Sequence, residues 1–176
     1  MNGKDKKIVV VRGGGDLASG TIWKLHRCGY KVLVLEINAP SAIRRNVAFS
    51  EAMYDGESKV EGIVCKKADN LEQAEVVWKE GNVPILEDSD GSLIEKLRPF
   101  AVVDAILAKK NIGTSKSMAP VTIALGPGFT AGIDVDAVIE TKRGHNLGRI
   151  YYQGSAAPNT GIPGIIAGYG KERVIH

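Results

Sequence analysis

The fold is decided by the stretch Ile8-Val9-Val10-Val11-Arg12-Gly13-Gly14-Gly15-Asp16-Leu17-Ala18. Its first four residues are a continuous β-branched run, which is typical of a strand buried on both faces of a parallel sheet. The glycines predict a tight turn, and apolar residues at helical spacing predict a helix from Asp16 to Cys28. Gly29 then stands where glycine commonly ends a helix. The stretch therefore predicts a strand, a glycine turn and a helix in direct succession.

A second aliphatic strand, Lys31 to Glu36, completes a strand–helix–strand unit with a right-handed crossover. Further strands are predicted at 60–64, 83–86 and 100–107, and further helices from Ser41, from Asp69 or Asn70 to Lys79, and from Ser89 or Asp90 to Leu97. Pro84 suggests that 83–86 is an edge strand. This alternation predicts an α/β fold with a Rossmann-like, doubly wound, mostly parallel sheet.

The pattern changes toward the end of the sequence. We expect residues 1–118 to form a Rossmann-like nucleotide-binding domain, and residues 119–176 to form a β- and loop-rich appendage packed on it. Short strands are predicted at 121–125, 137–140 and 149–152. The segment 154–170 is rich in glycine and proline, and we expect it to contribute a subunit interface in a homo-oligomer.

The glycine turn matches the pattern G-x-G-x-x-A, in which Gly13 allows the tight turn, Gly15 lets the backbone approach a phosphate, and Ala18 lets the helix pack closely. The amino end of the helix adds partial positive charge. Glu36 ends the second strand, where an acid binds a ribose hydroxyl in dinucleotide sites. We expect the cofactor to contact this acid and the turn: Gly13, Gly14, Gly15, Asp16, Leu17, Ala18.

Two features near the turn leave alternatives open. Asp16 would repel an anion unless it caps the helix, and Arg12 is a candidate to offset its charge. Arg44 and Arg45 lie where selectivity for a 2′-phosphate is usually set, and arginine binds phosphate bidentately. A glycine turn without ligand and an arginine pair on a solvated helix face are the structural alternatives.

Polar residues also lie at the end of the strand predicted at 100–107. Asp104 is a carboxylate in an apolar strand, which is costly unless it is paired or near the open end. Lys109 and Asn111 follow that strand's carboxyl end, where open α/β sheets bind ligands. Asp104 and Asn111 are candidate contacts to a second ligand group, and Lys109 is a weak catalytic candidate. A buried ion pair is the alternative for Asp104.

A loop between two glycines, Gly144 and Gly148, carries a histidine and lies between two arginines. Arg143 and Arg149 are candidates for an anion cradle, and His145 could transfer protons. A purely structural histidine is the alternative.

The cysteines and the composition set further expectations. Lys66 and Lys67 would lower the pKa of Cys65 and make it a weak catalytic candidate, although an inert thiol is the alternative. Two cysteines form neither a disulfide framework nor a zinc motif, so no metal is expected. The net charge of +3 does not require nucleic acid. The absence of a secretion signal or long apolar run favours a cytoplasmic protein without a membrane partner.

Several long segments together resemble the YqeB-type accessory proteins of selenium-dependent molybdenum hydroxylase systems. The resemblance rests on Val11–Gly20, Ile43–Ala52, Asp104–Asn111, Gly128–Gly132, Ile139–Gly148 and Asn159–Gly164, and it covers nearly the whole chain. The resemblance implies a role in maturing molybdenum hydroxylases that need labile selenium. It also implies a Rossmann part similar to that of XdhC/CoxI-type proteins, which handle the molybdenum cofactor, and a family that continues past His176 into a small β-rich segment.

The leading hypothesis is therefore an accessory protein that binds a nucleotide, which could be NAD(P) or a molybdopterin nucleotide. Its protein partner would be a molybdenum hydroxylase or a selenium donor, and whether it catalyses a reaction is left open. An NAD(P)-dependent oxidoreductase is the first alternative, with Lys109 and His145 as proton donors. A non-catalytic binding module is the second.

Overall fold

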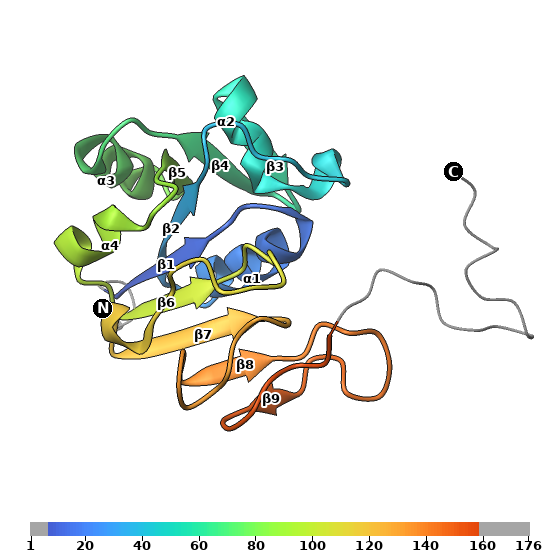
Figure 1. Cartoon of the computed structure of the whole chain (residues 1–176). Helices are drawn as coiled ribbons and strands as arrows, with labels where there is room; N and C mark the ends of the chain where they lie inside the picture. Colours follow the sequence, from blue (N-terminus) through green and yellow to red (C-terminus); the bar gives the residue numbers. More distant parts are fainter. Residues whose placement is uncertain (1–6, 159–176) are drawn as a thin grey trace, which may run out of the picture.

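A computed structural model describes residues 7–158 and shows an α/β protein built on one nine-stranded, mostly parallel sheet (Figure 1). The strands are β1 (Ile8–Arg12), β2 (Lys31–Glu36), β3 (Glu57–Val60), β4 (Ile63–Lys67), β5 (Val83–Glu87), β6 (Ala101–Asp104), β7 (Val121–Leu125), β8 (Ala137–Ile139) and β9 (Ile150–Tyr151). The α-helices are α1 (Asp16–Arg27), α2 (Ala52–Asp55), α3 (Leu71–Lys79) and α4 (Ser92–Leu97), and three 3-10 helices are η1 (Arg45–Val47), η2 (Phe49–Glu51) and η3 (Lys116–Met118).

The strand order is β3-β4-β5-β2-β1-β6-β7-β8-β9. From the central strand β1 the chain passes to the neighbouring β2, then to the outer strands β3 and β4, and returns to β5 between β4 and β2. On the other side of β1, the strands β6, β7 and β8 follow one another outward. Neighbouring strands from β4 to β8 pair in parallel, whereas β3 and β9 pair antiparallel at the two ends. The carboxyl ends of the parallel strands therefore share one edge, at the right in Figure 1.

The central strand confirms the prediction of burial on both faces. Val9 and Val11 belong to the core beneath α1, together with Ala18 and Ile22 of that helix. Val10 belongs to the opposite core, beneath α3 and α4. The predicted strand, glycine turn and helix are confirmed, and the helix ends at Cys28 and Gly29, whose φ of 85° only glycine adopts readily.

The prediction of a helix from Ser41 is wrong. The segment forms η1, η2 and the short α2 instead. Its backbone N–H groups are used elsewhere: that of Phe49 donates to the Ser19 hydroxyl, and that of Ser50 donates to the Gly14 carbonyl. Because these N–H groups bond to α1 and to the glycine turn, they are not available for an α-helical ladder.

Two strand predictions also need correction. The strand predicted at 60–64 is a hairpin of β3 and β4, whose turn residues Glu61 and Gly62 both have positive φ. Pro84 does not mark an edge, because β5 lies between β4 and β2. Pairing of β5 with β2 begins only at Ile85, so the missing N–H of Pro84 interrupts no bond to that strand.

The domain boundary expected at residue 118 lies between two strands of one continuous sheet. β7 pairs in parallel with β6, β8 pairs with β7, and all three belong to the same sheet as β1. The connection from β6 to β7 contains η3 and otherwise non-helical chain. Most of the Gly- and Pro-rich segment expected at an interface lies outside the described residues. Within residues 7–158, no helix has the length and apolar character needed to cross a membrane.

Candidate functional site: the glycine turn

The turn between β1 and α1 requires glycine at its first position. Gly13 has a φ of 95° and donates its N–H to the Leu35 carbonyl at 2.8 Å. A Cβ at Gly13 would lie 2.9 Å from the backbone oxygen of Ala105. Both the backbone conformation and the close approach of the β6 end therefore exclude a larger residue.

Glu36 lies at the glycine turn, as the sequence predicts. One carboxylate oxygen accepts the N–H of Gly14 at 2.7 Å, and the other accepts the N–H of Ile37 at 2.9 Å. A carboxylate has about four acceptor sites, so these two bonds orient the half-buried group and leave acceptor capacity for a ligand hydroxyl. That Glu36 binds ribose stays a prediction.

Gly15 faces open space. It is the residue before the first turn of α1, and a Cβ added to it would meet no atom within 4 Å among the described residues. The first N–H groups of an α-helix have no acceptor within the helix and carry partial positive charge. Ala18 is fully buried beneath the turn, while Leu17 is exposed. The amino end of α1 therefore lies next to open space at Gly15, whereas the N–H groups of Gly13 and Gly14 are already bonded within the protein.

The charge of Asp16 is offset by Arg44 and not by Arg12. The Arg44 guanidinium forms an ion pair with the Asp16 carboxylate at the start of α1. Arg12 is buried on the opposite face of the sheet, where it donates to the Thr114 hydroxyl at 2.6 Å. The ion pair places Arg44 beside the first turn of α1.

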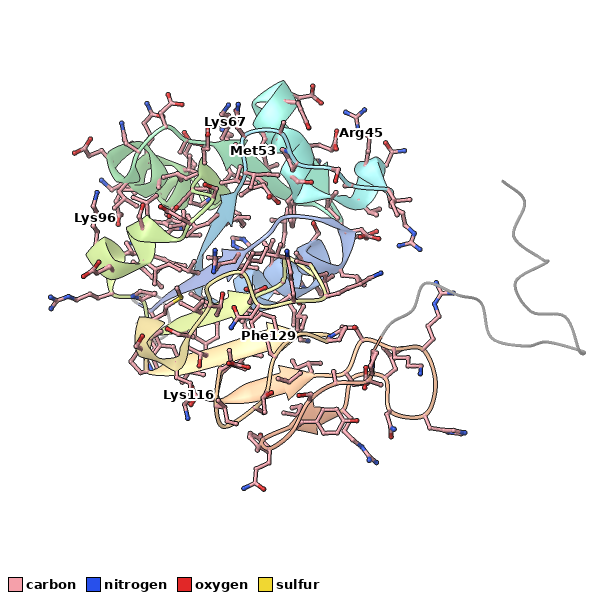
Figure 2. All side chains as sticks on the ribbon, viewed as in Figure 1. Arg45, Met53, Lys67, Lys96, Lys116 and Phe129 are labelled. Atoms are coloured by element: carbon pink, nitrogen blue, oxygen red, sulfur yellow. The ribbon has the colours of Figure 1, made fainter. Side chains whose placement is uncertain are left out.

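The structure does not support the predicted phosphate contact of Arg45, because a neighbouring carboxylate holds its side chain. Its guanidinium donates to the Glu51 carboxylate at 2.7 Å on the outer surface of the η1–η2 segment, as the label in Figure 2 shows. The hydrogen bond that Arg45 donates to the Glu51 carboxylate is the main reason that the pKa of Arg45 is raised. Arg45 therefore pairs within its own segment, whereas Arg44 reaches α1.

Asp104 takes part in a buried network at the carboxyl end of β6. Its carboxylate accepts the Thr114 hydroxyl at 2.6 Å and the Ile106 N–H at 3.1 Å. The same Thr114 oxygen accepts the Arg12 guanidinium, so one hydroxyl links two buried charges. Asn111 holds the loop by accepting the N–H of Thr114 at 2.9 Å. This network accounts for Asp104 and Asn111 without a ligand. Its central residue, Thr114, belongs to no motif that the sequence indicated.

The loop after β8 carries the second group of predicted contacts. Arg143, His145 and Arg149 are exposed, in the orange loop at the right of Figure 1. The buried Glu140 lies at the start of this loop and holds it in place. Its carboxylate accepts the N–H groups of Lys142 and Ala157, each at 2.8 Å. β8 is three strands from β1, about 14 Å across a sheet. The loop shares the carboxyl edge with the glycine turn but lies beyond the span of a single phosphate.

The two other catalytic candidates differ in environment. Cys65 is fully buried in the core, and burial raises the pKa of its thiol. The prediction that neighbouring lysines activate Cys65 is therefore wrong, because Lys66 pairs with Glu80 and Lys67 donates to the Met53 carbonyl. Lys109 is exposed in a left-handed conformation, with a φ of 60°.

A cavity of about 740 Å³ lies apart from this turn, on the sheet face that α3 and α4 cover. It is lined by residues of α4 and of the chain around η3, including Gly91, Ile94, Arg98, Ser115, Met118 and Pro120. Within residues 7–158, no group of three histidine, cysteine or acidic side chains could hold a metal ion.

The fold and the turn define an α/β protein whose glycine-rich turn leads from the central strand into the first helix. The chain is 52% identical over 169 residues to the protein named "Uncharacterized protein YqeB" of Escherichia coli (strain K12). This similarity covers 96% of the chain and 31% of that relative, so the chain spans about a third of the relative's length. It supports the YqeB-type family that the sequence motifs indicate. The chain matches no family model and no solved structure.

Proposed function

We propose that this chain binds a nucleotide, or a nucleotide-linked molybdenum cofactor, at the glycine turn. The supporting observation is the open space at Gly15 beside a glutamate already held at the turn, by the 2.7 Å bond from Gly14 to Glu36. A phosphate at Gly15 would meet helix N–H groups, and a ribose hydroxyl would meet Glu36. The strand order, which places β2 on one side of β1 and β6 on the other, favours a Rossmann-like crevice at this edge.

The biological role that we propose is that of an accessory protein in the maturation of selenium-dependent molybdenum hydroxylases. This role rests on the resemblance of the motifs to YqeB-type proteins. A molybdopterin nucleotide would present to these donors the same kind of group as NAD(P), a pyrophosphate linked to a nucleoside. A hydroxylase or a selenium donor would be the protein partner, in the cytoplasm.

The experiment is a thermal-shift panel of NAD, NADP, FAD, ADP, CTP and molybdenum-cofactor nucleotides. A ligand that binds the native state raises the unfolding midpoint by mass action. Gly15→Val places its side chain in the open space without a protein contact within 4 Å of the new Cβ. We expect one nucleotide to raise the midpoint of the wild type and to lose this effect in Gly15→Val.

Gly20→Val is the matched control. Gly20 lies on the exposed side of the same helix, and a Cβ there also meets nothing within 4 Å. We expect this variant to keep the full ligand-induced shift. The proposal is contradicted if no nucleotide shifts the wild type, or if Gly15→Val and Gly20→Val respond to the nucleotide equally.

The alternative function is hydride transfer by an NAD(P)-dependent oxidoreductase, which can be tested with the same nucleotides. Its proton-donor candidates, Lys109 and His145, belong to different loops, after β6 and after β8. Oxidation of NADPH above the spontaneous rate, abolished in a variant of either residue, would favour the oxidoreductase over an accessory protein.

A further inference from the structure

One buried hydroxyl at the glycine turn has no hydrogen-bond partner. Ser50, in η2, is 2% exposed, and its Oγ has no partner among the described residues. Buried polar groups are nearly always hydrogen-bonded, because an unmade bond leaves the cost of desolvation uncompensated. A hydroxyl kept without a protein partner therefore calls for an acceptor from outside the chain.

Ser50 is in direct contact with the turn. Its backbone N–H donates to the Gly14 carbonyl at 2.8 Å. Its N and Cα lie 3.1 and 3.3 Å from the point where a Cβ on Gly14 would be. The Ser50 backbone therefore packs directly against the Gly14 backbone of the turn.

The nearest carbonyls of the turn already have donors. Gly14 accepts the Ser50 N–H, Gly15 accepts the Ser19 N–H, and the Ser19 hydroxyl lies within 3.2 Å of the first and 2.9 Å of the second. A carbonyl oxygen has two lone pairs. The turn therefore has little acceptor capacity left for Ser50.

The two ends of the segment 44–51 are held differently: Phe49 and Ser50 bond through buried backbone N–H groups to Ser19 and Gly14, whereas Arg44 is attached by a surface ion pair. Arg44 pairs with Asp16 at the start of α1, and the Arg44 side chain is 61% exposed. Surface ion pairs contribute little to stability. An anion at the first turn of α1 would compete with Asp16 for Arg44, and this competition would free the Arg44 side chain to pair with the anion.

We propose that Ser50 is a ligand-contact residue, whose hydroxyl donates to an anionic oxygen of the nucleotide phosphate bound at the glycine turn. The hydroxyl is buried in the structure, so the contact forms when the Ser50 side chain turns toward the bound phosphate. This inference rests on the proposed nucleotide binding and adds a residue that the sequence motifs did not identify. It also gives Arg44 a role, as the cation that pairs with the bound phosphate.

The test compares Ser50→Ala with Ser58→Ala, because the Ser58 hydroxyl has a partner, the Ala48 carbonyl at 3.1 Å. The affinities for ADP and CDP are measured by calorimetry, and the unfolding midpoints are measured without ligand. We expect Ser50→Ala to weaken nucleotide binding by about 3–10-fold, the effect of one hydrogen bond. Its midpoint should equal or exceed that of the wild type, because the variant removes an unpartnered group.

Ser58→Ala should do the opposite: its midpoint falls by about 2–4 °C and its nucleotide affinity is unchanged. If Ser50→Ala binds the nucleotide as well as the wild type does, or is destabilised like Ser58→Ala, the role of Ser50 is refuted while nucleotide binding stands. If the wild type binds neither ADP nor CDP, the proposed nucleotide binding and the role of Ser50 both fail.

Discussion

At the scale of single residues, the glycines at the carboxyl edge fall into two kinds. Some are needed only for a positive φ, such as Gly113, where a Cβ would meet nothing within 4 Å. Others also allow two loops to touch, such as Gly128, where a Cβ would lie 2.6 Å from the backbone of Lys110. The second kind ties the loop after β7 to the loop after β6, and so fixes the edge on which the candidate ligand contacts lie.

This difference predicts unequal costs for the same substitution. Gly113→Ala should lower the free energy of unfolding by about 1 kcal/mol, because it adds only backbone strain. Gly128→Ala should cost about 3 kcal/mol or more, because the overlap with Lys110 must also be relieved. Urea denaturation of both variants measures the difference. Equal losses would mean that the loops separate easily.

The two cysteines should react very differently. Cys65 is buried, and burial raises the pKa of its thiol, whereas Cys28 is exposed. Since the thiolate is the reactive form, a thiol reagent at pH 8 should modify one cysteine quickly in the native protein and both in urea. Rapid labelling of Cys65 in the native state would contradict its place in the core.

At the scale of elements, a threonine ties the central strands together. The Thr114 hydroxyl bonds to Arg12 of β1 and to Asp104 of β6, both at 2.6 Å. Thr114→Val leaves both buried charges without this partner and should lower the free energy of unfolding by about 3 kcal/mol. Thr114→Ser, which keeps the hydroxyl, should retain most of the wild-type stability. Denaturant unfolding measures the stability of each variant, and Thr130→Val, at a more exposed threonine, is the control. The role of Thr114 would be contradicted if Thr114→Val lost no more stability than Thr130→Val.

The loop after β8 should depend on pH through Glu140. Burial alone would raise the pKa of Glu140, but the backbone N–H groups of Ala157 and Lys142 lower it overall. A lowered pKa in the folded state contributes stability above the ordinary glutamate pKa, and this contribution is lost as the pH falls through the lower folded value.

Glu140→Gln should therefore destabilise the protein by about 1–3 kcal/mol at pH 7 and by less at pH 3. The exposed Glu87→Gln serves as control, and urea denaturation at both pH values is the measurement. A loss of stability that is the same at pH 7 and pH 3 would show that the charge of Glu140 is not what stabilises the loop.

The elements that sequence could predict are those fixed by local pattern. β1, the glycine turn and α1 follow from β-branched residues, glycines and helical spacing. The segment 44–51 could not be predicted, because its backbone bonds to Ser19 and Gly14, which are distant in sequence. The roles of Thr114 and Ser50 could not be predicted for a similar reason. The role of a single hydroxyl depends on which buried groups surround it, and the sequence does not show these neighbours.

At the scale of the whole molecule, the carboxyl edge of one parallel sheet gathers the predicted contacts. The glycine turn and Glu36 lie at β1 and β2, and Arg143 and Arg149 lie in the loop after β8. An extended dinucleotide lying along this edge could reach from the first group toward the second. A ligand that contacts both groups should therefore bind more tightly than ADP.

This extension predicts a graded response in the loop variants. Arg143→Ala and Arg149→Ala should weaken the binding of a dinucleotide while leaving the affinity for ADP unchanged, because ADP is too short to reach β8. Calorimetric titration with NAD and ADP measures both. Equal losses for NAD and ADP would place the mononucleotide itself near the β8 loop.

The most direct measurement is a ¹H–¹⁵N NMR titration of the ¹⁵N-labelled protein with ADP. The proposed site predicts the largest amide shifts at Gly14 to Ala18, at Glu36 and in the segment 44–51. It also predicts small shifts around the cavity beside α4. Shifts confined to that cavity, or no shifts at all, would contradict nucleotide binding at the glycine turn.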